Sequence, residues 1–98
     1  QGMRGNRIHD GKNDGVSILS GQGILEENEI FANKYDGVDI FYGSNPTLRR
    51  NRIFQNGFAG ICMINRGWFW FTTKVASGTF TDNEIRDNAD GAWRYTKI

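Results

Sequence analysis

Short stretches of alternating apolar and polar residues recur along the chain, and turn-forming Gly, Asn, Asp and Ser separate them. This alternation is typical of β-strands joined by turns, and no stretch keeps a helical period over a useful length. One phrase, an asparagine followed by a charged residue and an isoleucine, occurs four times. Its asparagines are Asn6, Asn28, Asn51 and Asn83, and the steps from 6 to 28, 28 to 51 and 51 to 83 are 22, 23 and 32 residues. A repeat of this length indicates a stacked array of coils.

Four coils align on this repeat, and apolar residues fall at matching positions in each of them. The coils run from Met3 to Gly21, from Leu25 to Gly43, from Leu48 to Gly67 and from Phe80 to the end. The matching apolar positions form four columns: Ile8, Ile30, Ile53 and Ile85; Val16, Val38, Ile61 and Ala92; Ile18, Ile40 and Met63; and Met3, Leu25, Leu48 and Phe80. One coil cannot bury its own apolar face, so these columns predict a core that the coils share.

The repeat therefore predicts an all-β fold, a right-handed parallel β-helix (solenoid) of about four coils with a loop insertion in the third. Parallel crossovers are right-handed in nearly all proteins, which sets the expected handedness. Residues 1–98 are expected to form one β-helix segment. Because the chain begins inside a repeat, we expect this segment to be part of a longer array.

The four repeated asparagines are expected to form an internal ladder at one corner of the coils. Asparagine tolerates the left-handed backbone conformation, and its amide can bond to the amides above and below it. The alternative is a ligand site built from asparagine side chains. An asparagine in every coil favours the structural interpretation.

Charges next to the ladder alternate in sign from coil to coil. The position after each ladder asparagine reads Arg7, Glu29, Arg52 and Glu84. Parallel stacking in register places such residues over one another, where opposite charges stabilise and like charges destabilise. Each exposed pair contributes only about 0–1 kcal/mol, so the alternation matters mainly for register.

Composition narrows the possible partners. The formal net charge of the 98 residues is +1, which gives no general attraction to nucleic acid, and no apolar run reaches the length of about eighteen residues that a membrane segment needs. Cys62 is the single cysteine, so no internal disulfide can form. A reducing, cytoplasmic location is the matching expectation.

Two places break the repeat. An insertion at 68–77 replaces a single residue of the first coil, and it opens with four consecutive aromatic residues: Trp68, Phe69, Trp70 and Phe71. These aromatics either fold back onto the array or form a binding protrusion, since a solvated loop rarely carries so many.

In the fourth coil, Asn83 and Gly91 are one residue closer together than the matching pairs in the other coils. Either the next strand shifts by one and buries Trp93 and Tyr95, or this end frays.

Several phrases of the chain resemble the right-handed β-helix repeats of F-box only proteins. They are NPTLRRNRIF at 45–54, GILEENEIF at 23–31 and IHDGK at 8–12, and the likeness covers nearly all of the chain outside 68–77. The resemblance implies a protein-recognition segment of a substrate receptor in an SCF-type ubiquitin ligase, acting in protein ubiquitination. Its partners would be a protein substrate and, through an F-box outside this chain, the Skp1–cullin scaffold. A broader group of polysaccharide-binding and polysaccharide-cleaving β-helix proteins shares the repeat style and supplies the alternative function.

Candidates for catalysis are few. Asp14, Asp36 and Asp90 precede turn glycines, and Asp39 occupies an outward strand position. An aspartate before glycine is usually a turn residue, and calcium needs six to eight oxygen ligands. We therefore expect no catalytic residue, no metal and no cofactor, although the spacing of paired acids is a three-dimensional property that sequence leaves open.

His9 and Cys62 are also poor candidates for catalysis. His9 shares a column with Phe31, Phe54 and Arg86, which favours a surface or strand-edge role. Cys62 has no histidine near it in sequence to activate it as a nucleophile.

The best candidates for partner binding are aromatic. Tyr35 and Phe58 share one turn column beside Lys34, and stacked aromatics on a rim can anchor a partner. The alternative is that both rings cap the apolar corner beneath them. Trp68 to Phe71 complete the predicted partner-binding set.

Overall fold

Twelve β-strands make up the computed structural model, which describes residues 2–66 and 75–98 and contains no helix in that part. The strands form three four-stranded sheets, and every pairing within them is parallel. The first sheet holds β1 (Gly2–Arg4), β4 (Ile24–Glu26), β7 (Thr47–Arg49) and β10 (Thr79–Thr81). The second holds β2 (Arg7–His9), β5 (Glu29–Phe31), β8 (Arg52–Phe54) and β11 (Glu84–Arg86). The third holds β3 (Val16–Ile18), β6 (Val38–Phe41), β9 (Ile61–Asn65) and β12 (Trp93–Lys97).

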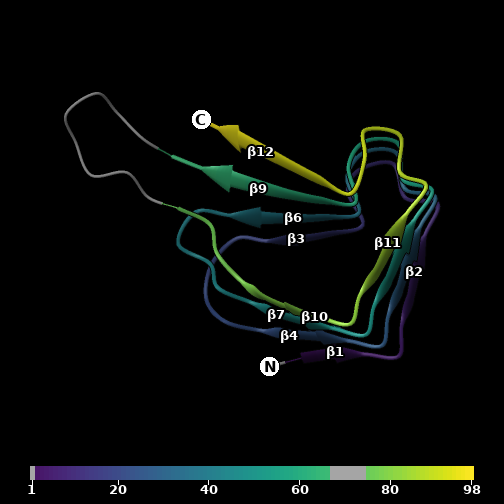
Figure 1. The fold of residues 1–98 in the computed structure, drawn as a ribbon, viewed down its shortest axis with the longest axis horizontal. Coiled ribbons are helices and arrows are strands. Elements are labelled where there is room, and N and C mark those ends of the chain that lie inside the picture. The colour runs from purple at the N-terminus through teal and green to yellow at the C-terminus, as the bar shows by residue number, and fades with distance from the viewer. Residues whose placement is uncertain (1, 67–74) are drawn as a thin grey trace.

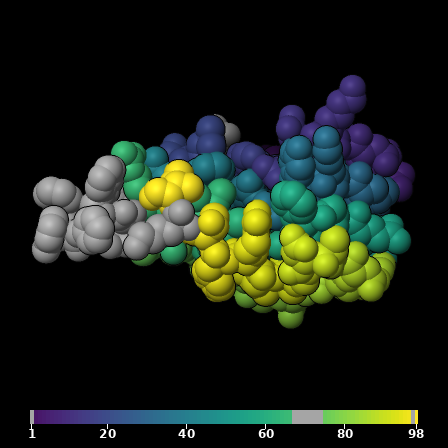
Figure 2. Space-filling model, turned by 90° about the horizontal axis from the view of Figure 1, so that it is seen from above, coloured from purple at the N-terminus to yellow at the C-terminus, as the bar shows by residue number. Residues whose placement is uncertain are grey.

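Each coil contributes one strand to each sheet, so the predicted parallel β-helix of about four coils is confirmed (Figure 1). The coils follow one another in chain order across the molecule, from purple to yellow in Figure 2. Ile30 pairs with Ile8 on one side and with Ile53 on the other, which is the predicted register. Side chains of all three sheets fill the interior, and the buried cluster consists of Leu25, Ile30, Val38, Ile40, Leu48, Ile53, Ile61 and Met63.

The predicted charge column is also confirmed. Glu29 lies between two arginines, with its Oε1 3.1 Å from Nε of Arg7 and its Oε2 2.9 Å from Nη1 of Arg52. Arg52 in turn lies 3.7 Å from Glu84. Because these side chains are largely exposed, each pair adds little free energy, and their effect is to penalise any slipped register.

The first corner of each coil carries the asparagine ladder. The backbone N–H and the Nδ2 of Asn28 both donate to Oδ1 of Asn51, at 3.0 and 3.1 Å, and Asn51 donates in the same way to Asn83. The left-handed conformation, which asparagine tolerates, is not adopted by the ladder asparagines themselves. It lies one residue earlier, at Gly5, Glu27, Arg50 and Asp82, with φ between 52° and 68°. The asparagine side chain then satisfies the backbone groups that this sharp turn exposes.

A second ladder, which the sequence analysis missed, repeats this arrangement at the next corner. Asn33 donates to Oδ1 of Asn56 and Asn56 donates to Oδ1 of Asn88, and in each case the preceding residue is left-handed. The signal was present, since each of these asparagines follows a first-ladder asparagine by five positions. In the first coil the matching residue is Gly11, whose N–H donates to Asn33.

The strand of the fourth coil does not adopt the register that aligning Gly91 with Gly60 predicts. Trp93 pairs with Ile61, Arg94 with Cys62 and Tyr95 with Met63, so the strand is shifted by one residue. The predicted place of Ala92 in the Val16–Val38–Ile61 column is therefore wrong. The shift puts Trp93 and Tyr95 in core columns, but they stay 37% and 71% exposed because no described coil covers them on that side.

The insertion leaves the coil after β9. On its return, the N–H of Ala76 donates to Oδ1 of Asn65 at 2.8 Å, and Gly43 donates to the carbonyl of Val75. These bonds hold the C-terminal end of the insertion against the coils. Trp68, Phe69, Trp70 and Phe71 lie outside the described residues.

Candidate functional site

The loops between the second and third sheets project from the body at one corner, as the stack of loops at the upper right of Figure 1 shows. They span 10–15, 32–37, 55–60 and 87–92. Backbone hydrogen bonds run from each loop to the next, for example from Phe58 to the carbonyl of Tyr35 at 3.0 Å and from Asp90 to the carbonyl of Phe58 at 3.0 Å. The loops therefore form a rigid wall beside the outer face of the third sheet.

Tyr35 and Phe58 lie side by side on this wall, and we call this pair the aromatic rim. Their ring centroids are 5.1 Å apart. Nζ of Lys34 lies 5.3 Å from the Tyr35 ring, and the guanidinium carbon of Arg94 lies 5.4 Å from the Phe58 ring. Phe58 is 37% exposed and Tyr35 is half-buried. The rim is thus an accessible aromatic surface between two cations.

Beneath the rim lies a buried group of donor atoms, which we call the acid–thiol cluster: Asp36, Asp39 and Cys62. One donor atom from each residue lies within 4.8 Å of the other two. Asp39 and Cys62 are neighbours on β6 and β9. They face outward because Val38 and Ile40, on either side of Asp39, point into the core. Asp36 reaches the same place from the loop.

Arg94 closes the cluster from the last coil. It pairs with Cys62 in the third sheet, and its Nη2 lies 3.0 Å from Oδ2 of Asp36. The other oxygen of Asp36 accepts a hydrogen bond from the N–H of Ala59 at 2.9 Å. Both Ala59 and Cys62 are small, so the arginine side chain can extend past the third coil to the second. Only the one-residue shift of the last strand brings Arg94 to this place.

Burial controls protonation in the cluster. The pKa of the Asp39 carboxyl is raised to about 9, first by burial and then by hydrogen bonding to Asp14 and Asp36 and by the charge of those two groups. The pKa of the Cys62 thiol is raised to about 11, again mainly by burial and next by the charge of Asp36. At neutral pH Asp39 is a neutral acid and Cys62 is a thiol.

Protonation and burial both weigh against catalysis at this corner. A thiol with a raised pKa is a poor nucleophile. Glycoside hydrolysis needs two carboxyl groups that reach the scissile bond of the sugar, whereas Asp36 and Asp39 are only 2% and 7% exposed. Calcium, which takes oxygen ligands only, does not fit a donor set that includes the Cys62 sulfur.

The remaining sequence candidates lie apart from one another. Asp14 belongs to the corner, because its Oδ1 accepts the N–H of Asp36 at 2.8 Å. Asp90 also precedes a turn glycine, but its backbone N–H donates to the carbonyl of Phe58, one residue out of step with the other coils. His9 stacks on Phe31 with centroids 4.8 Å apart and lies 2.6 Å from Asp10, at the surface.

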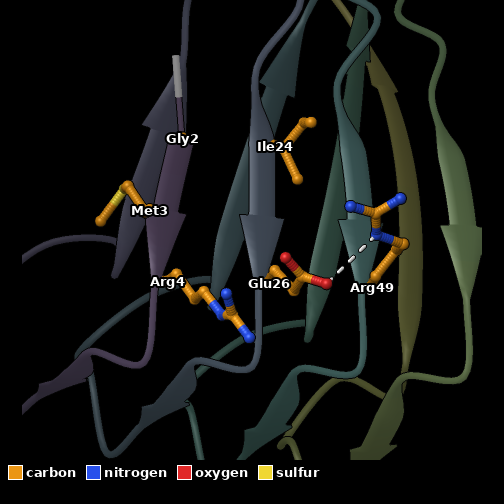
Figure 3. Close-up of a pocket in the computed structure, with 6 residues that line it drawn as sticks. All are labelled: Gly2, Met3, Arg4, Ile24, Glu26 and Arg49. Carbon is orange, nitrogen blue, oxygen red and sulfur yellow. Dashed lines mark ion pairs between the residues drawn. The ribbon is translucent and has the colours of Figure 1, made fainter.

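Away from the loop corner, a hollow opens on the outer face of the first sheet (Figure 3). It measures about 280 Å³ and exists because Gly2 has no side chain beside Ile24. Its charged wall is partly neutralised, since Glu26 pairs with Arg49 at 3.5 Å and also contacts Arg50. The hollow is smaller than most ligand pockets, and the unpaired polar atom in its lining, Nε of Arg49, already lies beside the Glu26 carboxylate. The loop corner is therefore the stronger candidate site.

Comparison with known proteins bears on the fold only. The family described as right-handed β-helix region matches residues 1–97, in agreement with the predicted handedness. No curated protein and no solved structure matches the chain. Within the described residues, no helix is long and apolar enough to cross a membrane.

Proposed function

Because the chain belongs to the right-handed β-helix family, we propose that it is a non-catalytic protein-recognition segment that binds a partner protein at its loop corner. Solenoid arrays commonly bind through such extended lateral surfaces. The observation that carries the proposal is the aromatic rim, in which the half-buried Tyr35 and the exposed Phe58 lie between Lys34 and Arg94.

The chemistry of the rim suits protein recognition. Aromatic residues and arginine dominate the binding energy of protein interfaces. The backbone bonds that link loop to loop hold Tyr35 and Phe58 in place before a partner arrives. Binding to such a preorganised surface costs little conformational entropy. The two neighbouring cations favour a partner surface that combines apolar and acidic side chains.

The resemblance to F-box only protein 10 and its relative F-box only protein 11 suggests a setting for this recognition. In that setting the segment would bind the protein substrate of an SCF-type ubiquitin ligase in the cytoplasm. The Skp1–cullin scaffold would bind an F-box elsewhere in the parent protein. This setting rests on the shared phrases at 45–54, 23–31 and 8–12, whereas the recognition role rests on the rim.

Polysaccharide cleavage, the competing function, has less support from the geometry. Asp36 and Asp39 are only 2% and 7% exposed, so a polysaccharide chain does not reach them in this structure. A depolymerisation screen with and without calcium tests it directly. Robust turnover that is lost in Asp36→Asn and Asp39→Asn would overturn the recognition proposal.

The recognition proposal is tested by proximity labelling in cells with the parent protein, followed by affinity measurements on the purified partner. The test variant is Tyr35→Ala/Phe58→Ala. The matched control is Phe31→Ala/Phe54→Ala, which removes another half-buried aromatic stack, on the second sheet. Loss of both rim rings should weaken binding roughly 10- to 30-fold. Equal weakening in both variants, or none in the rim variant, would refute a binding role for the rim.

A further inference from the structure

The acid–thiol cluster holds a polar atom that the fold leaves unsatisfied. Asp39 is only 7% exposed, and among the described residues no group donates to or accepts from its Oδ1. Buried polar atoms nearly always have a partner, because an unpaired one loses its hydration without compensation. A carboxylate oxygen of Asp39 lies within 4.8 Å of both the Cys62 sulfur and a carboxylate oxygen of Asp36. This arrangement suggests a ligand that the three groups share.

The donor types select the class of ligand. Zinc accepts both cysteine sulfur, at about 2.3 Å, and carboxylate oxygen, at about 2.0–2.2 Å. Calcium and magnesium take oxygen ligands and would leave the Cys62 sulfur unused. The donor atoms need to close by roughly an ångström to reach zinc distances, which side-chain rotation can supply. Three protein ligands would leave one tetrahedral position for water.

Arg94 supplies positive charge at the same place. Its guanidinium contacts Asp36 at 3.0 Å, and its side chain is 42% exposed. An arginine with this exposure can turn into solvent without leaving a cavity in the core. It therefore acts as an internal cation that covers the cluster and competes with any metal ion for Asp36.

We propose that Asp36, Asp39 and Cys62 form a binding site for a borderline-soft divalent cation of the zinc class, and that Arg94 is the competing internal cation. This site lies beside the aromatic rim and does not depend on the recognition function. Binding converts the Cys62 thiol to a metal-bound thiolate and displaces the acidic proton of Asp39, so both protons pass to the buffer. Arg94 moves off Asp36 into solvent.

Cobalt(II) is the probe for this site, because a cysteine thiolate bound to cobalt gives a charge-transfer band in the near ultraviolet. The wild-type chain of residues 1–98, titrated with Co²⁺ alone, should show this band, and Zn²⁺ should abolish it by displacement. Asp39→Asn should weaken Co²⁺ binding at least 10-fold. Cys62→Ser should lose the band completely. Asp90→Asn, which removes an exposed acid outside the cluster, should bind as the wild type does.

The variant Arg94→Gln separates this proposal from simple binding to a surface acid. Removal of the competing cation should tighten Co²⁺ binding at least 5-fold. A second readout is the melting temperature, which Zn²⁺ should raise in the wild type and leave unchanged in Cys62→Ser, so the test survives if Arg94→Gln does not fold. Absence of the band in the wild type at millimolar Co²⁺, or its persistence in Cys62→Ser, would overturn the proposal.

Discussion

Arg94 of β12 contacts Asp36 of the loop before β6 at 3.0 Å, although one full coil lies between them. The side chains of Ala59 and Cys62 in the intervening coil are small, which leaves room for the arginine to reach the second coil. It ties the last coil to the second and places a cation over the acid–thiol cluster. It also holds Arg94 against the Phe58 ring, so one side chain takes part in both the rim and the cluster.

Asp39 should make the stability of the chain depend on pH. Its pKa is raised in the folded state from 3.8 to about 9, so between these values the folded state binds a proton that the unfolded state has lost. The free energy of unfolding should therefore fall as pH rises, by at most about 1.4 kcal/mol per pH unit from this group.

Urea unfolding between pH 5 and pH 8, with a chelator present, measures this effect. Asp39→Asn mimics the neutral acid and should flatten the profile and raise stability at pH 8. Asp90→Asn should leave the slope unchanged. The upper limit of pH 8 stays below the ordinary thiol pKa of 9.0, from which Cys62, with its pKa raised to about 11 in the folded state, would also begin to lower stability. A profile as steep in Asp39→Asn as in the wild type would contradict the assignment.

Asn51→Ala should destabilise the chain by about 2–4 kcal/mol. Asn51 is fully buried, accepts from Asn28, and donates to Asn83 and to the carbonyl of Leu25, so its loss leaves several buried groups unpaired. Urea unfolding gives the value. Asn6→Ala, at the exposed end of the same ladder, should cost less than half as much, and similar costs at both positions would argue against the ladder as the cause.

Gly37→Ala should cost about 2–4 kcal/mol or prevent folding. A Cβ at Gly37 would lie 2.5 Å from Cγ2 of Ile53 and 2.6 Å from the carbonyl oxygen of Gly60, both in the next coil. In the fourth coil Ala92 occupies the position equivalent to Gly37, and no described coil lies beyond it for its Cβ to contact. Ala92→Gly is the control and should cost less than about 1 kcal/mol in thermal or urea unfolding. A well-tolerated alanine at Gly37 would show that the coils can separate there.

Glu29→Gln should cost only about 0.5–1 kcal/mol at low salt, even though Glu29 contacts both Arg7 and Arg52. The contacts are exposed, so about 1 M NaCl should remove most of the difference. Glu29→Lys should be worse than Glu29→Gln, because it stacks three cations in one column. Unfolding at two salt concentrations measures both effects. A cost that does not change with salt would mean that Glu29 acts through packing rather than charge.

The sequence by itself determined the β-helix, its coils and most of its register. These features repeat: Ile30 has a counterpart in every coil, and the signs at Arg7, Glu29, Arg52 and Glu84 permit only one stacking. A feature that depends only on residues within one coil appears again in every coil, so the sequence shows it several times and its pattern can be recognised.

Only the tertiary structure decided the candidate site. The last strand pairs one residue away from the register that aligning Gly91 with Gly60 predicts, and this shift brings Arg94 beside Cys62. Small side chains in the third coil then let Arg94 reach Asp36 in the second coil. The burial of Asp39, which raises its pKa, comes with neighbours from other parts of the chain, Asp36 of the loop and Cys62 of the next coil. Such contacts occur once and join residues up to 58 positions apart, and no repeat pattern can encode them.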